Sequence, residues 1–217
     1  MKRANRNSDF ERDKVKRALI ISAIVLGLCL PGIAAERWSK EKANAWHKEH
    51  GWLVGCNFGP STAINQLEMW QGETFDVKTI DRELGWCADL GFNSVRVYLH
   101  DLVWKNNAKG FVKRIDTFLS VADRHGIGVM FVLLDGCWDP FPKAGKQRAP
   151  KPHVHNSGWV QSPGAEILKD PARHDEMKGY VKGVVSRFAK DRRVHAWDLF
   201  NEPDNPNVSA YGKVELE

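Results

Sequence analysis

The chain has 217 residues, of which 42% are hydrophobic and 27% are charged, and its formal net charge is +5. This length fits a single domain, and the composition is that of a globular protein. Residues 1–18 hold seven Lys or Arg residues and three acids, a net charge of +4, which leaves +1 for the remaining chain. A nearly neutral domain has no electrostatic footprint for nucleic acid, so we expect no nucleic-acid partner.

Residues 19–35 carry no charge, and their apolar run ends at Pro31-Gly32 before the small residues Ala34 and Ala35. A basic start, a short apolar run and small residues are typical of a secretory signal peptide. The run is shorter than the roughly 20 residues that span a bilayer. We therefore expect residues 1–35 to be a signal peptide and the protein to be secreted or periplasmic, with no stable membrane span after removal. The alternative is a membrane anchor formed by residues 19–35.

The first elements of the remaining segment, residues 36–217, combine a helix, a strand and a second helix. Residues 38–51 are polar and are predicted to form a short helix or a lead-in. The apolar run 52–58 stops at Gly59-Pro60, which predicts a strand followed by a loop. Apolar residues spaced three and four apart predict a helix over residues 76–90, with Gly91 as its stop.

The same alternation continues to residue 201. A strand is predicted at 94–99, a helix at 110–125 with Gly126 as its stop, and a strand at 128–134. The third strand is continuously apolar, which is typical of a buried parallel sheet. A long irregular loop follows, then a helix and a fourth strand; these segments are 135–170, 171–190 and 194–201.

Alternating strands and helices predict an α/β fold with a parallel sheet and right-handed crossovers. The two candidates are a (β/α)8 TIM barrel and an open doubly wound sheet. We favour the barrel, because the long loops follow strands and no glycine-rich phosphate motif follows the first strand. The chain would hold about four β/α units.

The segment Trp197-Asp198-Leu199-Phe200-Asn201-Glu202-Pro203 ends the fourth predicted strand in a carboxylate. At a barrel rim Glu202 would be partly shielded from water, and desolvation favours the protonated form of a carboxyl group, as a general acid requires. Asn201 offers an amide to a hydroxyl group. The alternative interpretation is an ordinary turn at the end of a strand.

Arg96 lies within an apolar strand and alternates with Val95 and Val97. A buried Arg must be paired, so we expect its side chain to reach into the barrel near the rim and to bind a carboxylate there. The alternative is a purely structural ion pair.

Polar and aromatic residues follow each of the first three strands. Clustered indole faces, amides and carboxylates suit a sugar chain, although each Trp alone is better explained by packing. Besides Arg96 and Asn201, the candidate ligand contacts are Asn57, His100, Asp101, Asp135 and Trp138. The same three clusters also contain Asn65, Gln66, Glu68, Met69 and Trp70 after the first strand, Trp104 after the second, and Asp139, His153, His155 and Trp159 after the third.

No metal site and no cofactor are predicted. His153 and His155 are two potential ligands where a metal site needs three or four. The spacing of Cys56, Cys87 and Cys137 matches neither a zinc site nor a disulfide framework, and buried free thiols are favoured over one bridge.

On the segments 197–203 and Asn93-Ser94-Val95-Arg96-Val97-Tyr98-Leu99, the chain resembles the retaining, cellulase-like glycoside hydrolases of the (β/α)8 clan, in the style of family five. The resemblance implies that Glu202 is the acid/base, that Asn201 binds a sugar 2-hydroxyl and that Arg96 orients the nucleophile. It implies hydrolysis of O-glycosidic bonds in a β-linked polysaccharide such as mannan, cellulose or xylan. One departure is the turn Asp135-Gly136-Cys137-Trp138, which replaces the usual His-containing turn.

In that family the nucleophile is a second Glu on the seventh strand, and retaining chemistry needs two carboxyls about 5–5.5 Å apart. The acids after Glu202 are Asp204, Glu215 and Glu217, in a polar tail. The sequence therefore predicts the N-terminal half of a glycosidase that lacks its nucleophile, is inactive alone and can self-associate through exposed sheet edges. The alternatives are a non-catalytic carbohydrate-binding half-barrel, a barrel hydrolase that completes its site by dimerising, and an open-sheet hydrolase of another class.

Overall fold

A computed structural model of the chain describes residues 37–203. The predicted signal peptide lies outside the described residues. The part before Trp52 holds helix α2 (Lys40–His50), which begins after Ser39, whose hydroxyl accepts a hydrogen bond from the Lys42 N–H at 3.2 Å. Within residues 37–203, no helix combines the length and the apolar character needed to cross a membrane.

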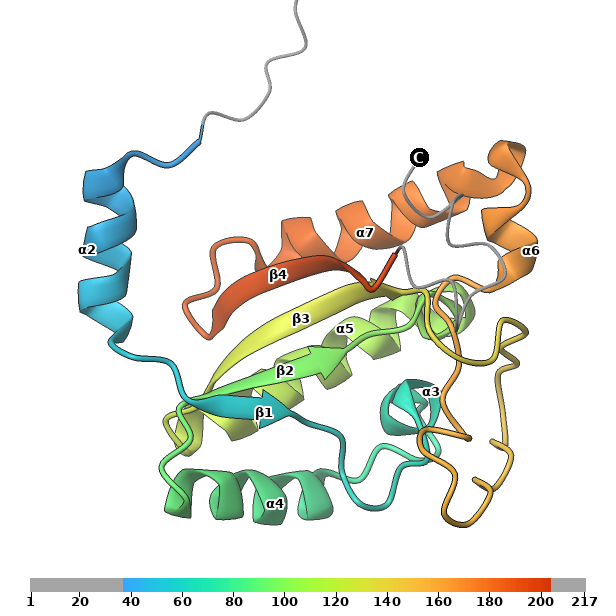
Figure 1. Ribbon diagram of the computed structural model, residues 1–217, viewed down its shortest axis with the longest axis horizontal. Helices are drawn as coiled ribbons and strands as arrows, with labels where there is room; N and C mark the ends of the chain where they lie inside the picture. Colours follow the sequence, from blue (N-terminus) through green and yellow to red (C-terminus); the bar gives the residue numbers. More distant parts are fainter. Residues whose placement is uncertain (1–36, 204–217) are drawn as a thin grey trace, which may run out of the picture. The chain divides into compact units, whose positions relative to one another are not determined.

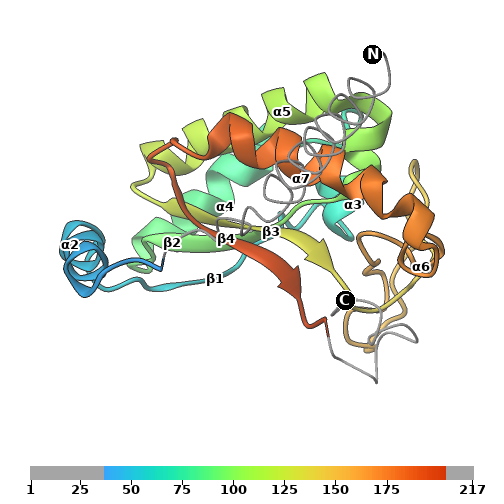
Figure 2. The same cartoon turned by 90° about the horizontal axis from the view of Figure 1, so that it is seen from above.

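The part that begins at Trp52 is an α/β unit with a parallel sheet hydrogen-bonded in the order β1-β2-β3-β4. The strands are β1 (Gly55–Asn57), β2 (Ser94–Tyr98), β3 (Gly128–Asp135) and β4 (Val194–Asn201). The helices that connect them lie on one face of the sheet (Figures 1 and 2); they are α4 (Val77–Asp89), α5 (Asp101–Arg124) and α7 (His174–Phe188). Strands neighbouring in chain order, with helices on one face, are the winding of a barrel and not of a doubly wound sheet. The predicted α/β fold with about four (β/α)8-type units is confirmed.

Two predicted helix ends depend on glycine. Gly91 and Gly126 have φ angles of +85° and +70°, in the left-handed region that glycine adopts without a steric penalty. Each lies just beyond the helix whose end it was predicted to mark.

Helix α5 begins nine residues earlier than the predicted residue 110. Asn107 interrupts it with a non-helical φ of −158°, and the Asn107 side chain accepts a hydrogen bond from the Gly110 N–H at 2.8 Å. The sequence pattern therefore detected only the segment after this kink. The apolar face predicted for that segment is fully buried: Phe111, Ile115, Phe118, Leu119 and Ala122.

Two short helices were not predicted, α3 (Gln66–Trp70) after β1 and α6 (Ala165–Leu168) in the long loop. The first three residues of the helix predicted at 171–190 form the 3₁₀ turn η1 (Pro171–Arg173), and α7 follows it. Helix α3 is too short to show a periodic pattern, and its first turn is fixed by Asn65, whose side chain accepts a hydrogen bond from the Glu68 N–H at 3.1 Å.

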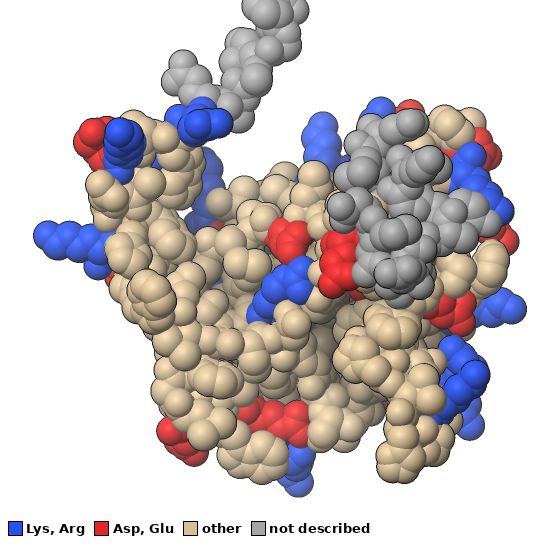
Figure 3. Space-filling view, viewed as in Figure 1, with Lys and Arg blue, Asp and Glu red and all other residues tan. Residues whose placement is uncertain are grey.

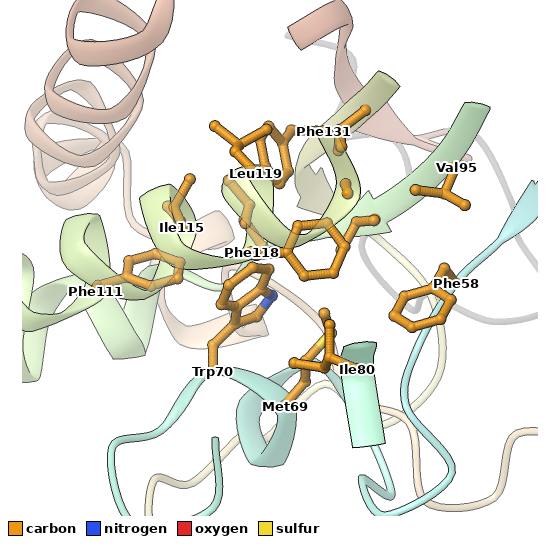
Figure 4. Packing of buried hydrophobic residues seen from close by; sticks show 14 of the residues in the cluster. Phe58, Met69, Trp70, Ile80, Val95, Phe111, Ile115, Phe118, Leu119 and Phe131 are labelled. Carbon is orange, nitrogen blue, oxygen red and sulfur yellow. The ribbon is translucent and has the colours of Figure 1, made fainter. Parts of the chain in front are cut away.

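The core fills the space between the sheet and its helices, and Trp70 lies at its centre (Figure 4). The Trp70 indole is fully buried, meets Phe111 and Phe118 edge-on at 5.7 and 5.5 Å between ring centroids, and donates to the Tyr98 carbonyl at 2.7 Å. Trp70, which belongs to one of the clusters predicted to suit a sugar chain, is therefore a packing residue.

We expect Trp70→Ala to lower the free energy of unfolding by about 3–5 kcal/mol, because it leaves a large cavity and removes an indole hydrogen bond. The control is Trp52→Ala, at a side chain that is 80% exposed, which we expect to change stability by less than about 0.5 kcal/mol. Urea unfolding of the two variants measures both effects. Equal losses would contradict the central position of Trp70.

Candidate active site

A cleft of about 620 Å³ opens at the carboxyl ends of the four strands. Each strand supplies part of its lining: Asn57 ends β1, Tyr98 ends β2, Cys137 follows β3 and Asn201 ends β4. Four of the predicted contact or catalytic residues line it, namely Asn57, Trp138, Asn201 and Glu202. This end of a parallel sheet is where barrel enzymes carry their chemistry.

The Arg96 guanidinium joins three strands beside the cleft. Its Nε and Nη2 donate to Asp198 Oδ2 at 3.0 and 2.5 Å, and Nη2 also donates to Asn201 Oδ1 at 2.8 Å. Its Nη1 donates to Asn57 Oδ1 at 3.2 Å and to the Tyr98 hydroxyl. Burial is the largest single effect and lowers the pKa of Arg96, but the hydrogen bonds to Asp198 and Tyr98, together with the charges of these two groups, outweigh it and keep the pKa above its ordinary value.

Arg96 thus binds a carboxylate, as predicted, and that carboxylate is Asp198 on β4. Figure 3 shows acidic and basic groups side by side near the middle of this face of the molecule. The side chains of Arg96 and Asp198 are 24% and 27% exposed, so the pair is screened by solvent only in part.

The Asn201 amide uses all of its hydrogen-bonding positions within the protein. Its Oδ1 accepts from Arg96 and from the Tyr98 hydroxyl at 3.3 Å, and its Nδ2 donates to Asp135 Oδ1 at 2.9 Å and to Cys137 Sγ at 3.5 Å. The residue is only 9% exposed. A sugar hydroxyl can therefore reach this amide only by displacing one of these bonds, of which those to Tyr98 and Cys137 are the longest.

Asp135, predicted as a ligand contact, supports the site from beneath. Its carboxylate accepts from Asn201 Nδ2, from the Cys137 N–H at 3.1 Å and from Trp159 Nε1 at 2.7 Å, and it is 1% exposed. Burial raises the pKa of Asp135, and the hydrogen bonds from Trp159 and Asn201 offset this only in part. A side chain so enclosed positions its neighbours and does not itself touch a ligand, which corrects the prediction.

Glu202 is exposed at the cleft, contrary to the expected shielding from water. Its backbone has a φ of +49°, and Trp138 and Asn156 have φ angles of +73° and +48°. All three residues line the cleft. A non-glycine residue in the left-handed region costs about 1–3 kcal/mol, and such strain concentrates at functional sites. Three of the four non-glycine residues with a positive φ in residues 37–203 thus lie at this cleft, and the fourth, His153, lies outside its lining.

Aromatic rings form the walls of the cleft. Trp159 meets Tyr98 edge-on at 5.2 Å between ring centroids, and Trp138 meets His155 edge-on at 5.5 Å. Trp159, Trp138 and His155 all belong to the long loop after β3, so this loop supplies much of the cleft surface. Half-buried indoles with polar edges suit a ligand that has both apolar faces and hydroxyl groups.

His100 and Asp101 do not reach the cleft and are 0% and 2% exposed. His100 Nδ1 accepts from the Leu102 N–H at 3.1 Å, and Asp101 Oδ1 accepts from the Ser162 hydroxyl at 2.9 Å. The prediction that they contact a ligand is corrected by the early start of α5, which makes His100 its buried N-cap and Asp101 its first residue instead of loop residues.

The polar cluster after β1 is likewise used for structure. Asn65, Gln66, Met69 and Trp70 are buried. The Asn65 side chain donates to Gln147 Oε1 at 2.9 Å and to the Gly158 carbonyl at 2.8 Å, which ties α3 to the long loop.

Asp198 and Tyr98 are site residues that sequence reasoning missed. Asp198 carried the same signal as Arg96, a charged residue within an otherwise apolar strand, and applying the pairing argument to both would have matched them. Within residues 37–203 no three His, Cys, Asp or Glu side chains lie close enough to hold a metal ion.

The fold and the polar groups together define a barrel-type site at the carboxyl ends of parallel strands. No family model matches the chain. It is 25% identical over 127 residues to a probable mannan endo-1,4-beta-mannosidase A of Aspergillus flavus, a match that covers 52% of this chain and 30% of that protein. The resemblance to mannanase-like glycoside hydrolases predicted from the sequence is therefore confirmed.

The solved structures that resemble the chain include two mannanases. A beta-mannanase from the blue mussel Mytilus edulis matches with a TM-score of 0.46 and 18% identity, over 70% of this chain and 42% of that one. An endo-1,4-beta-mannanase from Rhizomucor miehei matches with a TM-score of 0.43 and 20% identity, over 64% and 43%. The chain thus spans less than half the length of each of these proteins.

We expect a double-mutant cycle on Arg96→Met and Asp198→Asn to give a coupling energy of about 1–3 kcal/mol, because this pair is partly buried and doubly hydrogen-bonded. Lys178 and Asp175, which form an ion pair with side chains 79% and 80% exposed, provide the control, with an expected coupling below about 0.5 kcal/mol. Urea unfolding measures both cycles. Equal coupling energies would contradict the central role of the Arg96 pair.

The raised pKa of Asp135 predicts a pH dependence of stability. Between the ordinary value of 3.8 and the higher value in the folded protein, the folded state binds more protons, so this group's stabilising contribution is lost as the pH rises. Relative to Asp135→Asn, the wild type should lose up to about 1.4 kcal/mol of unfolding free energy per pH unit above that ordinary value. Denaturant unfolding of both proteins across this range measures the slope, and a difference that grows in the opposite direction would exclude the assignment.

Proposed function

We propose that this α/β unit is the acid/base half of a retaining glycoside hydrolase that acts on a β-linked polysaccharide, with mannan as the first candidate. The observation that carries the proposal is Glu202, exposed and held in a strained conformation at the end of β4, in a cleft walled by Trp138 and Trp159. The similarity to a probable mannan endo-1,4-beta-mannosidase supports the choice of mannan.

In the proposed reaction, the Glu202 carboxyl gives its proton to the glycosidic oxygen as the bond from that oxygen to the anomeric carbon breaks. A second carboxylate attacks the anomeric carbon and forms a glycosyl ester. Glu202, now a carboxylate, then takes a proton from the water that displaces this ester. Arg96 and Asn201 act as positioning residues, because their hydrogen bonds hold the end of β4 beneath Glu202.

The second carboxylate is proposed to come from outside residues 37–203. Besides Glu202, the described carboxylates of the Arg96–Asn201 network are Asp135 and Asp198. Asp135 is enclosed by three donors, and Asp198 is bound to Arg96. Neither is free to attack a sugar, so we propose that this unit alone binds a polysaccharide without cleaving it.

A carbohydrate-binding half-barrel without catalytic function is the second candidate, and the same aromatic walls favour it. In that case Glu202 would only contribute to affinity. The strained backbone of Glu202 favours the catalytic proposal, because strain of about 1–3 kcal/mol is retained where a side chain must be aimed.

Two further expectations from the sequence remain predictions. They are export from the cell, predicted from residues 1–35, and association through the outer edges of β1 and β4.

We expect the chain to bind a β-1,4-mannan oligosaccharide, measured by titration calorimetry, and to bind an α-linked dextran oligosaccharide much more weakly. Trp138→Ala should weaken mannan binding about tenfold through the loss of an aromatic wall. Trp86→Ala, at a side chain on α4 that is 55% exposed outside the cleft, should leave the affinity unchanged.

Product analysis separates the two candidate functions. The proposed acid/base half releases no sugar alone, but it should release sugar when a polypeptide that supplies the second carboxylate is added, and Glu202→Gln should abolish this release. Sugar release by the chain alone, abolished by Glu202→Gln, would contradict the proposal that it binds a polysaccharide without cleaving it. Binding without release under every condition would favour the binding module.

A further inference from the structure

Cys137 lies between the buried network and the exposed Glu202. Its Sγ is 3.4 Å from Glu202 Oε2 and 3.5 Å from Asn201 Nδ2. The residue is only 4% exposed, although it contributes to the cleft lining. It belongs to the turn after β3, whose backbone is fixed by the Cys137 N–H bond to Asp135 at 3.1 Å.

The directions of these hydrogen bonds follow from the chemistry of the groups. The Asn201 Nδ2 can only donate, so the sulfur accepts from it. An ionised Glu202 can only accept, so in the contact between these two groups the thiol is the donor. The Asp135 carboxylate is a second acceptor beside the same thiol. The contacts therefore form one directed chain, from the Asn201 amide to the Cys137 sulfur and from the Cys137 S–H to Glu202.

This direction requires a thiol that keeps its proton. Burial raises the pKa of Cys137 well above its ordinary value, and the nearby carboxylates of Asp135 and Glu202 raise it further. At neutral pH the group is therefore a protonated, unreactive donor and not a nucleophile.

We propose that Cys137 is a positioning residue for Glu202, and that its S–H donates a hydrogen bond which fixes the rotamer of the carboxylate over the cleft. Glu202 is an exposed side chain on strained backbone, and an exposed carboxylate has several accessible rotamers. The donor ties it to the network of Arg96 and Asn201. This inference rests on the proposed function of Glu202, but its test needs no sugar.

The first experiment measures the alkylation of Cys137 by iodoacetamide in the full-length chain, followed by mass spectrometry of the labelled peptide. Removing the neighbouring charge with Glu202→Gln should favour the thiolate, so we expect labelling of Cys137 at a fixed alkaline pH to become about three- to tenfold faster. Cys56, an exposed thiol in the middle of β1 and outside the cleft lining, is the internal control and should be labelled at an unchanged rate. An unchanged rate at Cys137, or an equal rise at both thiols, would overturn the proposal.

The second experiment compares Cys137→Ser, which keeps a hydroxyl donor, with Cys137→Ala, which removes the donor. In NMR spectra of glutamate side-chain carboxyl carbons, the resonance that disappears in Glu202→Gln identifies Glu202. We expect Cys137→Ala to shift or broaden this resonance and Cys137→Ser to keep it sharp. A purely structural role of the thiol would leave the resonance unchanged in both folded variants, which would refute the proposal. If Cys137→Ala does not fold, the Cys137→Ser spectrum and the alkylation rates still test the positioning role of Cys137.

The outcomes separate this inference from the proposed function. Failure to bind a mannan oligosaccharide would refute the function and leave the thiol contact standing. Binding of the oligosaccharide together with an unchanged alkylation rate in Glu202→Gln would leave the function standing and refute the role of Cys137.

Discussion

The ion pair between Arg96 and Asp198 is the interaction on which the site depends. A guanidinium within an apolar strand is costly unless its donors are satisfied, and this one is satisfied by groups from β1, β2 and β4. The same bonds fix the positions of the strand ends relative to one another. Arg96 holds the Asn201 side chain by a hydrogen bond. Because Glu202 directly follows Asn201, the same bond helps to fix the backbone position of Glu202.

The strained backbone conformation of Glu202 depends on these hydrogen bonds between the strand ends. A left-handed φ at a glutamate costs free energy, and it persists only where the surroundings determine the conformation. Asn201 supplies this constraint, since all four of its hydrogen-bonding positions are used by Arg96, Tyr98, Asp135 and Cys137. A fully satisfied network of this kind rigidifies a site, whereas the loss of one member leaves a buried polar group without a partner.

The sequence was informative where the structure is dictated by a repeating pattern or by a single residue whose burial costs free energy. The alternation of apolar runs gave the four strands, and the cost of burying Arg96 gave its carboxylate partner. It was less informative where polar residues follow a strand, because the same residue types cap a helix and contact a ligand. His100 caps α5 and Asn65 caps α3, and only the start of the helix distinguishes these roles. The exposure of Glu202 could not be read from composition either, since it depends on how the loop after β3 folds.

The turn Asp135-Gly136-Cys137-Trp138 gives this site its individual character. Its carboxylate holds Asn201 and Trp159 from beneath, its thiol contacts Glu202, and its indole forms a wall of the cleft in a strained conformation. A thiol is a weaker donor than a hydroxyl and gives a longer bond, so in the proposed role it would restrain Glu202 by a weak hydrogen bond. An acid/base group must gain and lose a proton in each reaction cycle, and a strong donor would favour the ionised form at every step. A weak, buried donor that keeps its own proton is therefore consistent with the acid/base role proposed for Glu202.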